Sequence, residues 1–277
     1  MNAVALMYHD VAAAGDEDST GFPGGDAARY KLTPDAFSAH LHAIRDRIHA
    51  RPTTANCLAA GAARPVLITF DDGGASAVGI ADCLDAFGWP GHFFVTTAYI
   101  DRPGFLTRGD IRALRARGHV VGSHSCTHPL RMAGCSTQRI QDEWSRSVAT
   151  LADILGERIE MASVPGGDHS PRVADAAAAA GVRVLFTSRP TIAVQVQDDL
   201  LVVGRFAIRR STSPARAAAV AAGASTPRLA QMLLWDLKAI GKTVAGPTYR
   251  RLRARRLGAS DRVRWGDDLA SVSEDPS

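Results

Sequence analysis

The chain is poor in cysteine and has no long apolar run. Only four of its 277 residues are cysteine, and no two of them are spaced as Cys-x-x-Cys, so the sequence implies no disulfide framework. No window of about 18 uninterrupted apolar residues occurs, and a membrane-spanning helix is therefore not expected. The opening MNAVALMYHDV has neither a basic leader nor a small-residue cleavage site. We interpret it as a first strand and expect a cytoplasmic protein.

Charge is unevenly distributed along the chain. Hydrophobic residues make up 46% of it, which allows a sizeable core in one α/β domain. Nine Lys or Arg residues but only one acid, Asp261, lie between Lys238 and Arg264. The remaining 23 basic and 27 acidic residues give the rest of the chain a formal charge of −4. We expect a main domain over 1–210, followed over 211–277 by an Ala-rich linker and a basic C-terminal helical extension.

The basic extension mixes apolar and cationic residues at partly helical spacing between Arg228 and Leu257. Such a segment could bind an anionic membrane surface, which would place the protein at the inner face of a membrane. It could equally be a solvated helix packed on the main domain. Because neither aromatic interleaving nor a known module accompanies the charge, nucleic-acid binding is not favoured.

Short apolar runs alternate with helix-like or loop-like sequence along the main domain. This alternation predicts parallel strands joined by helical crossovers, and seven such runs favour an irregular (β/α) barrel over an open sheet. The expected strands span 4–8, 66–70, 92–96, 119–123, 159–164, 182–187 and 200–208. The expected helices span 33–49, 80–87, 107–117, 137–155 and 172–180, and the Gly- and acid-rich stretch 14–28 is expected to be a surface loop.

The first motif with chemical content is VLITFDDGG at 66–74, an apolar strand that ends in Asp71 and Asp72. An isolated Asp-Asp-Gly is typical of a surface turn. Here, however, the two carboxylates stand at the end of a buried strand, where barrel enzymes build their active sites. The position therefore favours a functional pair.

The second motif, GHVVGSHSCTHP at 118–129, places His124 and His128 after another apolar strand. Four-residue spacing suits one turn of helix, on which both imidazoles could bind one cation at the usual Zn–N distance of about 2.0–2.1 Å. Ordinary polar loop residues are the alternative. Together with the carboxylate pair, two imidazoles and one Asp form a common catalytic site for one divalent metal ion. Zinc is the first choice, and iron, cobalt or nickel are alternatives.

Such a site needs only one of the two Asp side chains as a ligand. The other carboxylate is then free to act as a general base beside a cation that lowers the pKa of bound water. The same cation can polarise a substrate carbonyl while the base takes the proton of the attacking water. The residues therefore predict a metal-dependent hydrolase.

These motifs resemble those of the polysaccharide deacetylase family, also called the NodB-homology or carbohydrate esterase family 4 group, in TFDDG at 69–73 and HSCTH at 124–128. The resemblance covers about 3–210. It implies that 1–210 is a catalytic domain with a distorted (β/α)7 barrel. It further implies that Asp71 is the catalytic base and that the metal ligands are Asp72, His124 and His128.

Further correspondence and one departure occur later in the chain. Pro165 and Gly167 match the family's third motif and are expected to bind substrate. Many members then carry Leu-x-His, whose histidine protonates the leaving amine, but this chain has Arg205 in that region. A guanidinium is a poor proton donor, so Arg205 is expected to bind substrate as an oxyanion or phosphate clamp. His169 and His9 are the remaining candidates for the acid, with exposed or structural histidines as the alternative.

The resemblance implies deacetylation of an N-acetylated amino sugar, as a glycan or sugar-lipid, in surface-polysaccharide or glycolipid biosynthesis. A cytoplasmic location favours a precursor or a lipid-linked sugar as the substrate. Two alternatives stay open. One is a deformylase or other amide hydrolase on the same scaffold. The other, suggested by the missing late histidine, is a catalytically silent carbohydrate-binding module.

Overall fold

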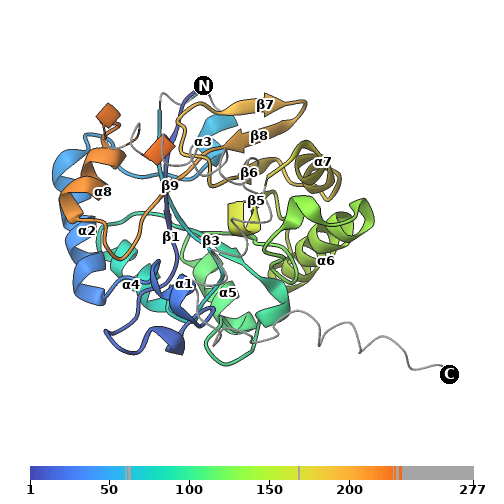
Figure 1. Cartoon of the computed structure of the whole chain (residues 1–277), viewed down its shortest axis with the longest axis horizontal. Helices are drawn as coiled ribbons and strands as arrows, with labels where there is room; N and C mark the ends of the chain where they lie inside the picture. The colour runs from blue at the N-terminus through green and yellow to red at the C-terminus, as the bar shows by residue number, and fades with distance from the viewer. Residues whose placement is uncertain (60, 62–63, 168, 227, 229–230, 233–277) are drawn as a thin grey trace, which may run out of the picture. The chain divides into compact units, whose positions relative to one another are not determined.

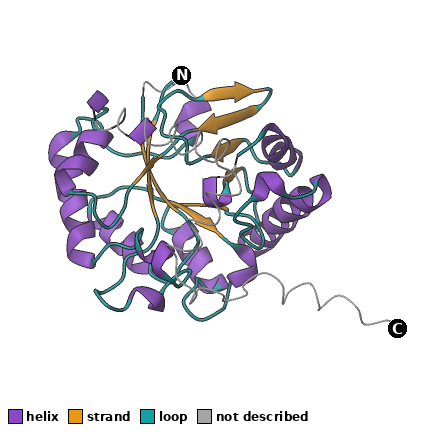
Figure 2. Ribbon diagram, viewed as in Figure 1, coloured by secondary structure: helices purple, strands orange, loops and turns teal. Residues whose placement is uncertain are grey.

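A single curled sheet of nine strands forms the centre of the protein, with helices around its outside (Figure 1 and Figure 2). The computed structural model describes residues 1–232 except 60, 62–63, 168, 227 and 229–230. The strand order is β7-β8-β6-β5-β4-β3-β2-β1-β9, and every neighbouring pair is parallel except β7 with β8. The strands are β1 (Val4–Tyr8), β2 (Val66–Phe70), β3 (His92–Val95), β4 (Val120–Ser123), β5 (Met161–Ser163), β6 (Val184–Phe186), β7 (Gln195–Gln197), β8 (Leu200–Val203) and β9 (Phe206–Ala207).

The distorted barrel expected from the sequence is confirmed, with two more strands than predicted. The apolar run 200–208 is divided by Gly204 and Arg205 into β8 and β9. Strand β7 was not predicted because its sequence, Gln-Val-Gln, is exposed throughout and carries no apolar alternation. It pairs antiparallel with β8 at one edge of the sheet, and no pairing among the described residues joins this edge to β9.

Five predicted helices are present within a few residues of their expected bounds. They are α2 (Pro34–Arg47), α4 (Ala77–Ala86), α5 (Arg108–Ala116), α6 (Thr137–Leu155) and α7 (Pro171–Ala179). The short helices α1 (Gly25–Ala28) and α3 (Asn56–Ala59) were not predicted. No helix among the described residues is both long and apolar enough to cross a membrane.

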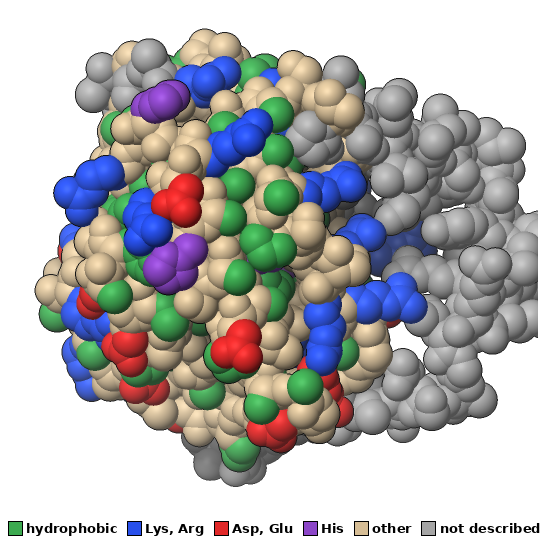
Figure 3. All heavy atoms as spheres, turned by 90° about the vertical axis from the view of Figure 1, so that its left-hand side faces the viewer, with side chains coloured by type: hydrophobic (Ala, Val, Ile, Leu, Met, Phe, Trp, Pro, Cys, Tyr) green, Lys and Arg blue, Asp and Glu red, His purple; other side chains and the backbone are tan. Residues whose placement is uncertain are grey.

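Helix α2 shows how these helices cover the sheet. The side chain of Thr33 accepts a hydrogen bond from Ala36 N, and Pro34 occupies the first turn, where its missing N–H costs nothing. Phe37, Leu41 and other buried residues at helical spacing face the core. The outer surface on this side of the molecule carries basic and acidic side chains interspersed with apolar ones (Figure 3).

The first compact unit extends to Gln231, past the boundary expected at residue 210. Helix α8 (Pro214–Ala221) accounts for part of this extension, because it packs against α2 and β1. Its buried side chains are Ala and Val, and this small-residue composition is what suggested a linker. The expected basic extension from 233 onwards lies outside the described residues.

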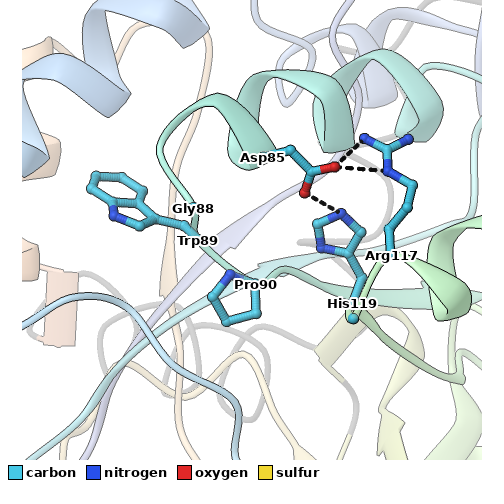
Figure 4. Close-up of a pocket in the computed structure, with 7 residues that line it drawn as sticks. Asp85, Gly88, Trp89, Pro90, Arg117 and His119 are labelled. Carbon is cyan, nitrogen blue, oxygen red and sulfur yellow. Dashed lines mark hydrogen bonds and ion pairs between the residues drawn. The ribbon is translucent and has the colours of Figure 1, made fainter.

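A pocket of about 380 Å³ lies beside the N-terminal ends of β3 and β4 (Figure 4). In it the carboxylate of Asp85 lies 2.8 Å from Arg117 Nη2 and 3.2 Å from His119 Nε2. His119 Nδ1 accepts a hydrogen bond from Gly91 N, so Nε2 carries the proton that faces Asp85. These contacts join α4 to the turn before β4, at the end of the barrel where stability is the usual role of polar groups.

His92 gives the fold a pH dependence. Its Nε2 accepts a hydrogen bond from Ala55 N at 3.0 Å, so Nδ1 carries the proton and donates to Ile68 O at 3.0 Å. This neutral ring has no exposed surface, and burial lowers its pKa to about 4. Below pH 6.5 this histidine becomes protonated in the unfolded chain but stays neutral in the folded chain. The free energy of unfolding that neutral His92 contributes is therefore lost as the pH falls from about 6.5 to about 4.

We expect His92→Gln, which cannot titrate, to lower stability at pH 7.5 but to lack this pH dependence. The difference in unfolding free energy between wild type and variant should shrink by up to about 3 kcal/mol between pH 7.5 and pH 4. Urea unfolding followed by circular dichroism at several pH values measures it. A difference that stays constant with pH would contradict the assignment.

Candidate metal centre

The two carboxylates of the first motif lie at the C-terminal end of β2. All five residues of this strand are buried, and Asp71 and Asp72 follow it without leaving the interior. Asp72 and Gly73 both have φ of +79°, a conformation that Asp tolerates better than most side chains. A Cβ on Gly74 would lie 1.9 Å from the carboxylate of Asp10. The glycines therefore permit the tight turn that holds both carboxylates at the barrel mouth.

The two imidazoles follow β4 on a loop, and the expectation that they share a helical turn is wrong. Residues 124–128 contain no helix, and Ser125 and His128 have positive φ values of 65° and 59°, which a right-handed helix excludes. The irregular loop nevertheless brings both rings to one point. Asp72 Oδ1 lies 3.4 Å from His124 Nε2 and 3.5 Å from His128 Nε2.

This donor set fits a divalent cation. The three ligand atoms lie within 4.8 Å of one another, and two donors bound tetrahedrally to zinc at about 2.0–2.1 Å would be about 3.4 Å apart. His124 Nδ1 lies 2.9 Å from Ser163 O, an acceptor only, so Nδ1 carries a proton and donates it there. This hydrogen bond leaves Nε2 as the nitrogen free to bind a metal.

The electrostatics of the three groups also suit a cation. Burial raises the pKa of Asp72, but His124 and two further imidazoles outweigh it and bring the pKa below its ordinary value. Burial lowers the pKa of His128 to about 4, so this ring is neutral near pH 7. Burial also lowers the pKa of His124, but the charges of Asp71 and Asp72 raise it further than burial lowers it. A bound cation would take the place of that proton.

Arg205 pairs with Asp71 beneath this centre. Nη1 and Nη2 each donate to one carboxylate oxygen at 2.7 Å, a bidentate geometry. The other three N–H groups donate to Thr69 Oγ1, Ser163 Oγ and Thr187 O. Arg205 has no exposed surface, and all five of its donors have protein partners. This arrangement differs from the substrate clamp expected from the sequence.

The ion pair determines the charge of Asp71. Burial raises the pKa of this carboxyl, but the adjacent Arg205 guanidinium outweighs it, and the pKa lies below its ordinary range. Asp71 is therefore anionic near pH 7.

The other predicted site residues lie on neighbouring loops. Pro165 and Gly167 form a short turn directly after β5, with Pro165 buried and Gly167 half-buried. His9, at the end of β1, is close enough for its charge to lower the pKa of both Asp71 and Asp72. Its Nδ1 is buried without a hydrogen-bond partner among the described residues.

His169 has a different environment. Burial lowers its pKa, and the nearby charge that lowers it further is Arg189. Of the two histidines proposed as proton donors, His9 is thus the one that the structure brings into electrostatic contact with the carboxylates.

One wall of the centre, formed by Phe22, was not predicted. Its ring centroid lies 4.8 Å from that of His128, and it also packs edge-on against Tyr99 and Phe105. Lys31, which is buried, holds the loop in place by donating to three backbone carbonyls, including that of Phe22 at 2.6 Å. No local pattern marks this phenylalanine, because its partners are distant in sequence. The buried Lys is equally hard to recognise within a loop rich in Gly and acids.

A family model and several solved structures are similar to this chain. The family model described as polysaccharide deacetylase matches residues 59–185, which include both carboxylates and both imidazoles. A polysaccharide deacetylase from Bacillus cereus has a TM-score of 0.67 at 19% identity, covering 80% of this chain and 69% of that one.

Two further solved structures are similar. The Streptococcus pyogenes deacetylase PplD, in complex with acetate, has a TM-score of 0.64 at 18% identity, covering 77% of this chain and 95% of its own. A de-N-acetylase from Aggregatibacter actinomycetemcomitans has a TM-score of 0.63 at 21% identity, covering 77% and 97%. These similarities establish the fold, and residues 59–185 match the family model described as polysaccharide deacetylase.

Proposed function

We propose that this protein is a metal-dependent deacetylase that hydrolyses the N-acetyl group of an amino sugar. The observation that carries the proposal is the convergence of Asp72, His124 and His128 on one point beside the anionic carboxylate of Asp71. A ligand set of two imidazoles and one carboxylate leaves positions open for water and substrate, as catalytic centres require. We assign Asp71 as the base that takes the proton of the attacking water.

The remaining steps follow from the residues around the centre. A divalent ion held by Asp72, His124 and His128, with zinc as first choice and iron, cobalt or nickel as alternatives, would polarise the acetyl carbonyl and lower the pKa of water. Arg205 keeps Asp71 anionic and fixes its orientation. We assign His9 as the donor of a proton to the leaving amine, because it is close enough for its charge to lower the pKa of both carboxylates. Pro165 and Gly167 would border the bound sugar.

The choice of an acetyl group draws support from two proteins of similar fold. One is a de-N-acetylase, and the other is a deacetylase that holds acetate. We further propose that the substrate is a glycan precursor or sugar-lipid used in surface-polysaccharide or glycolipid biosynthesis, and that the protein acts in the cytoplasm.

Metal removal tests the centre directly. Treatment with a chelator should abolish acetate release from N-acetylhexosamine compounds, and added Zn²⁺ should restore it. Asp72→Ala should bind less than one ion per chain by elemental analysis and should not be rescued by Zn²⁺. Asp142→Asn, an exposed carboxylate on α6, is the matched control and should behave as wild type. Undiminished turnover in metal-free protein would refute the proposal, and formate release in place of acetate would identify a deformylase.

Asp71→Asn separates an enzyme from a silent carbohydrate-binding module. The variant keeps the size of the side chain and leaves the three metal ligands in place, so it should still bind one ion per chain. Loss of the base should lower the turnover number by about 10²–10⁴-fold. Acetate release and metal content are measured on the same sample. Equal, negligible turnover in wild type and variant would instead support the binding module.

The proton donor is tested with two leaving groups. If His9 protonates the leaving amine, His9→Asn should slow hydrolysis of an N-acetyl sugar by about 10²-fold or more but barely affect an aryl acetate ester, whose phenolate leaves without a proton. His169→Asn should show no such selectivity. Equal loss on both substrates in His9→Asn would remove His9 as the acid, and selective loss in His169→Asn would assign that role to His169.

A further inference from the structure

The loop that carries both imidazoles has every backbone N–H from residue 124 to residue 128 paired. The amide of His124 donates to Val95 O, and those of Ser125 and His128 donate to serine hydroxyls, that of Ser123 at the end of β4 and that of Ser125 in the loop. The two amides between them have a different kind of acceptor. Both donate to a side chain from helix α6.

That side chain is Glu143. Its Oε2 accepts from Cys126 N at 3.0 Å and from Thr127 N at 2.7 Å, and its Oε1 accepts a hydrogen bond from the hydroxyl of Thr127. Glu143 is only 5% exposed. A buried carboxylate thus holds the segment between the two metal ligands by three hydrogen bonds.

The two backbone amides can only donate, so the oxygen that they share has to be an acceptor, whereas the Thr127 hydroxyl can donate or accept. A carboxylate accepts all three hydrogen bonds. A glutamine could keep both amide contacts with its NH₂ group turned towards the hydroxyl, but a methionine, of similar length, would keep none of the three. Since the loop also holds Ser125 and His128 at positive φ, an unsupported backbone could relax away from this conformation.

A second contact from α6 supports the same loop. Ser147, one turn further along the helix, lies 2.7 Å from Ser123 through the two hydroxyls, and Ser123 Oγ in turn accepts from Ser125 N. Helix α6 therefore reaches both ends of the segment that precedes His128. Ile140, Trp144 and Leu151 place the same face of the helix in the core, so the anchor is rigid.

We infer that Glu143 is a positioning residue of the metal centre, which holds His124 and His128 in ligand geometry through the backbone between them without touching the ion. The inference rests on the proposed function, since it assigns a role towards the metal that function requires. It also explains why an otherwise costly buried anion stands on the core face of an amphipathic helix.

The test is metal affinity of the full chain, with no turnover needed. Apo-protein competes with a chromophoric chelator for Zn²⁺, and Co²⁺ substitution reports ligand geometry through its visible absorption. Glu143→Met, which keeps the length of the side chain but has no oxygen to accept these hydrogen bonds, should bind Zn²⁺ about 10–100-fold more weakly than wild type and should show an altered Co²⁺ spectrum. Asp142→Asn removes the same charge from the exposed neighbour, whose side chain contacts Gln138, and should match wild type in both.

A folded Glu143→Met protein with the Zn²⁺ affinity and Co²⁺ spectrum of wild type would overturn the inference. If this variant does not fold, Thr127→Val decides, because it removes one of the three donors and leaves the helix unchanged. It should weaken Zn²⁺ binding by at least about threefold, and wild-type affinity would overturn the inference. Wild-type protein that binds no Zn²⁺ would overturn the proposed function as well.

Discussion

The ion pair between Asp71 and Arg205 is the constraint around which the centre of the barrel is arranged. A guanidinium without exposed surface is tolerable only if its donors are paired, and here all five N–H groups have acceptors on β2, on β5 and after β6. These acceptors come from strands that are not all neighbours in the sheet. The curl of the sheet therefore has to bring them together, and the same curl places Asp72 opposite the loop that follows β4.

The two carboxylates and the two imidazoles are carried by strained or irregular backbone segments. Residues from other elements pack against each segment or accept hydrogen bonds from it. The positive φ of Asp72 is followed by glycines that fit against Asp10 and Val95. The positive φ values of the histidine loop are matched by hydrogen bonds that the loop amides donate to Glu143 on α6. Strain of this kind persists only where the surroundings over-determine it, which is typical of binding and catalytic sites.

Sequence patterns predicted the bounds of a strand well where every residue of that strand is buried. Strands β1 and β2 have the expected bounds because each mainly apolar run ends at a polar residue, His9 or Asp71. Asp71, Asp72, His124 and His128 stood out in the sequence because each pair follows a buried strand. Helix α8 lies in the stretch predicted to be a linker, because its buried side chains are small. The Ser-Pro pair at 213–214 is nevertheless typical of the start of a helix.

What the sequence could not predict are contacts between distant residues. Arg205 and Asp71 are separated by 134 positions, and no local pattern connects them. The shape of the histidine loop depends on α6 in the same way, so a four-residue spacing typical of a helix was misleading. Glu143 did leave a trace in the sequence, since an acid on the same stripe as Ile140 and Trp144 is unexpected for a core-facing position.

Ser163 belongs to both halves of the centre. Its carbonyl accepts from His124, and its hydroxyl accepts from Arg205, which in turn pairs with Asp71. A displacement of this one residue at the end of β5 would therefore move the imidazole of His124 and the carboxylate of Asp71 together. Under the proposed function, a substitution at Ser163 would thus alter metal affinity and the strength of the base at the same time.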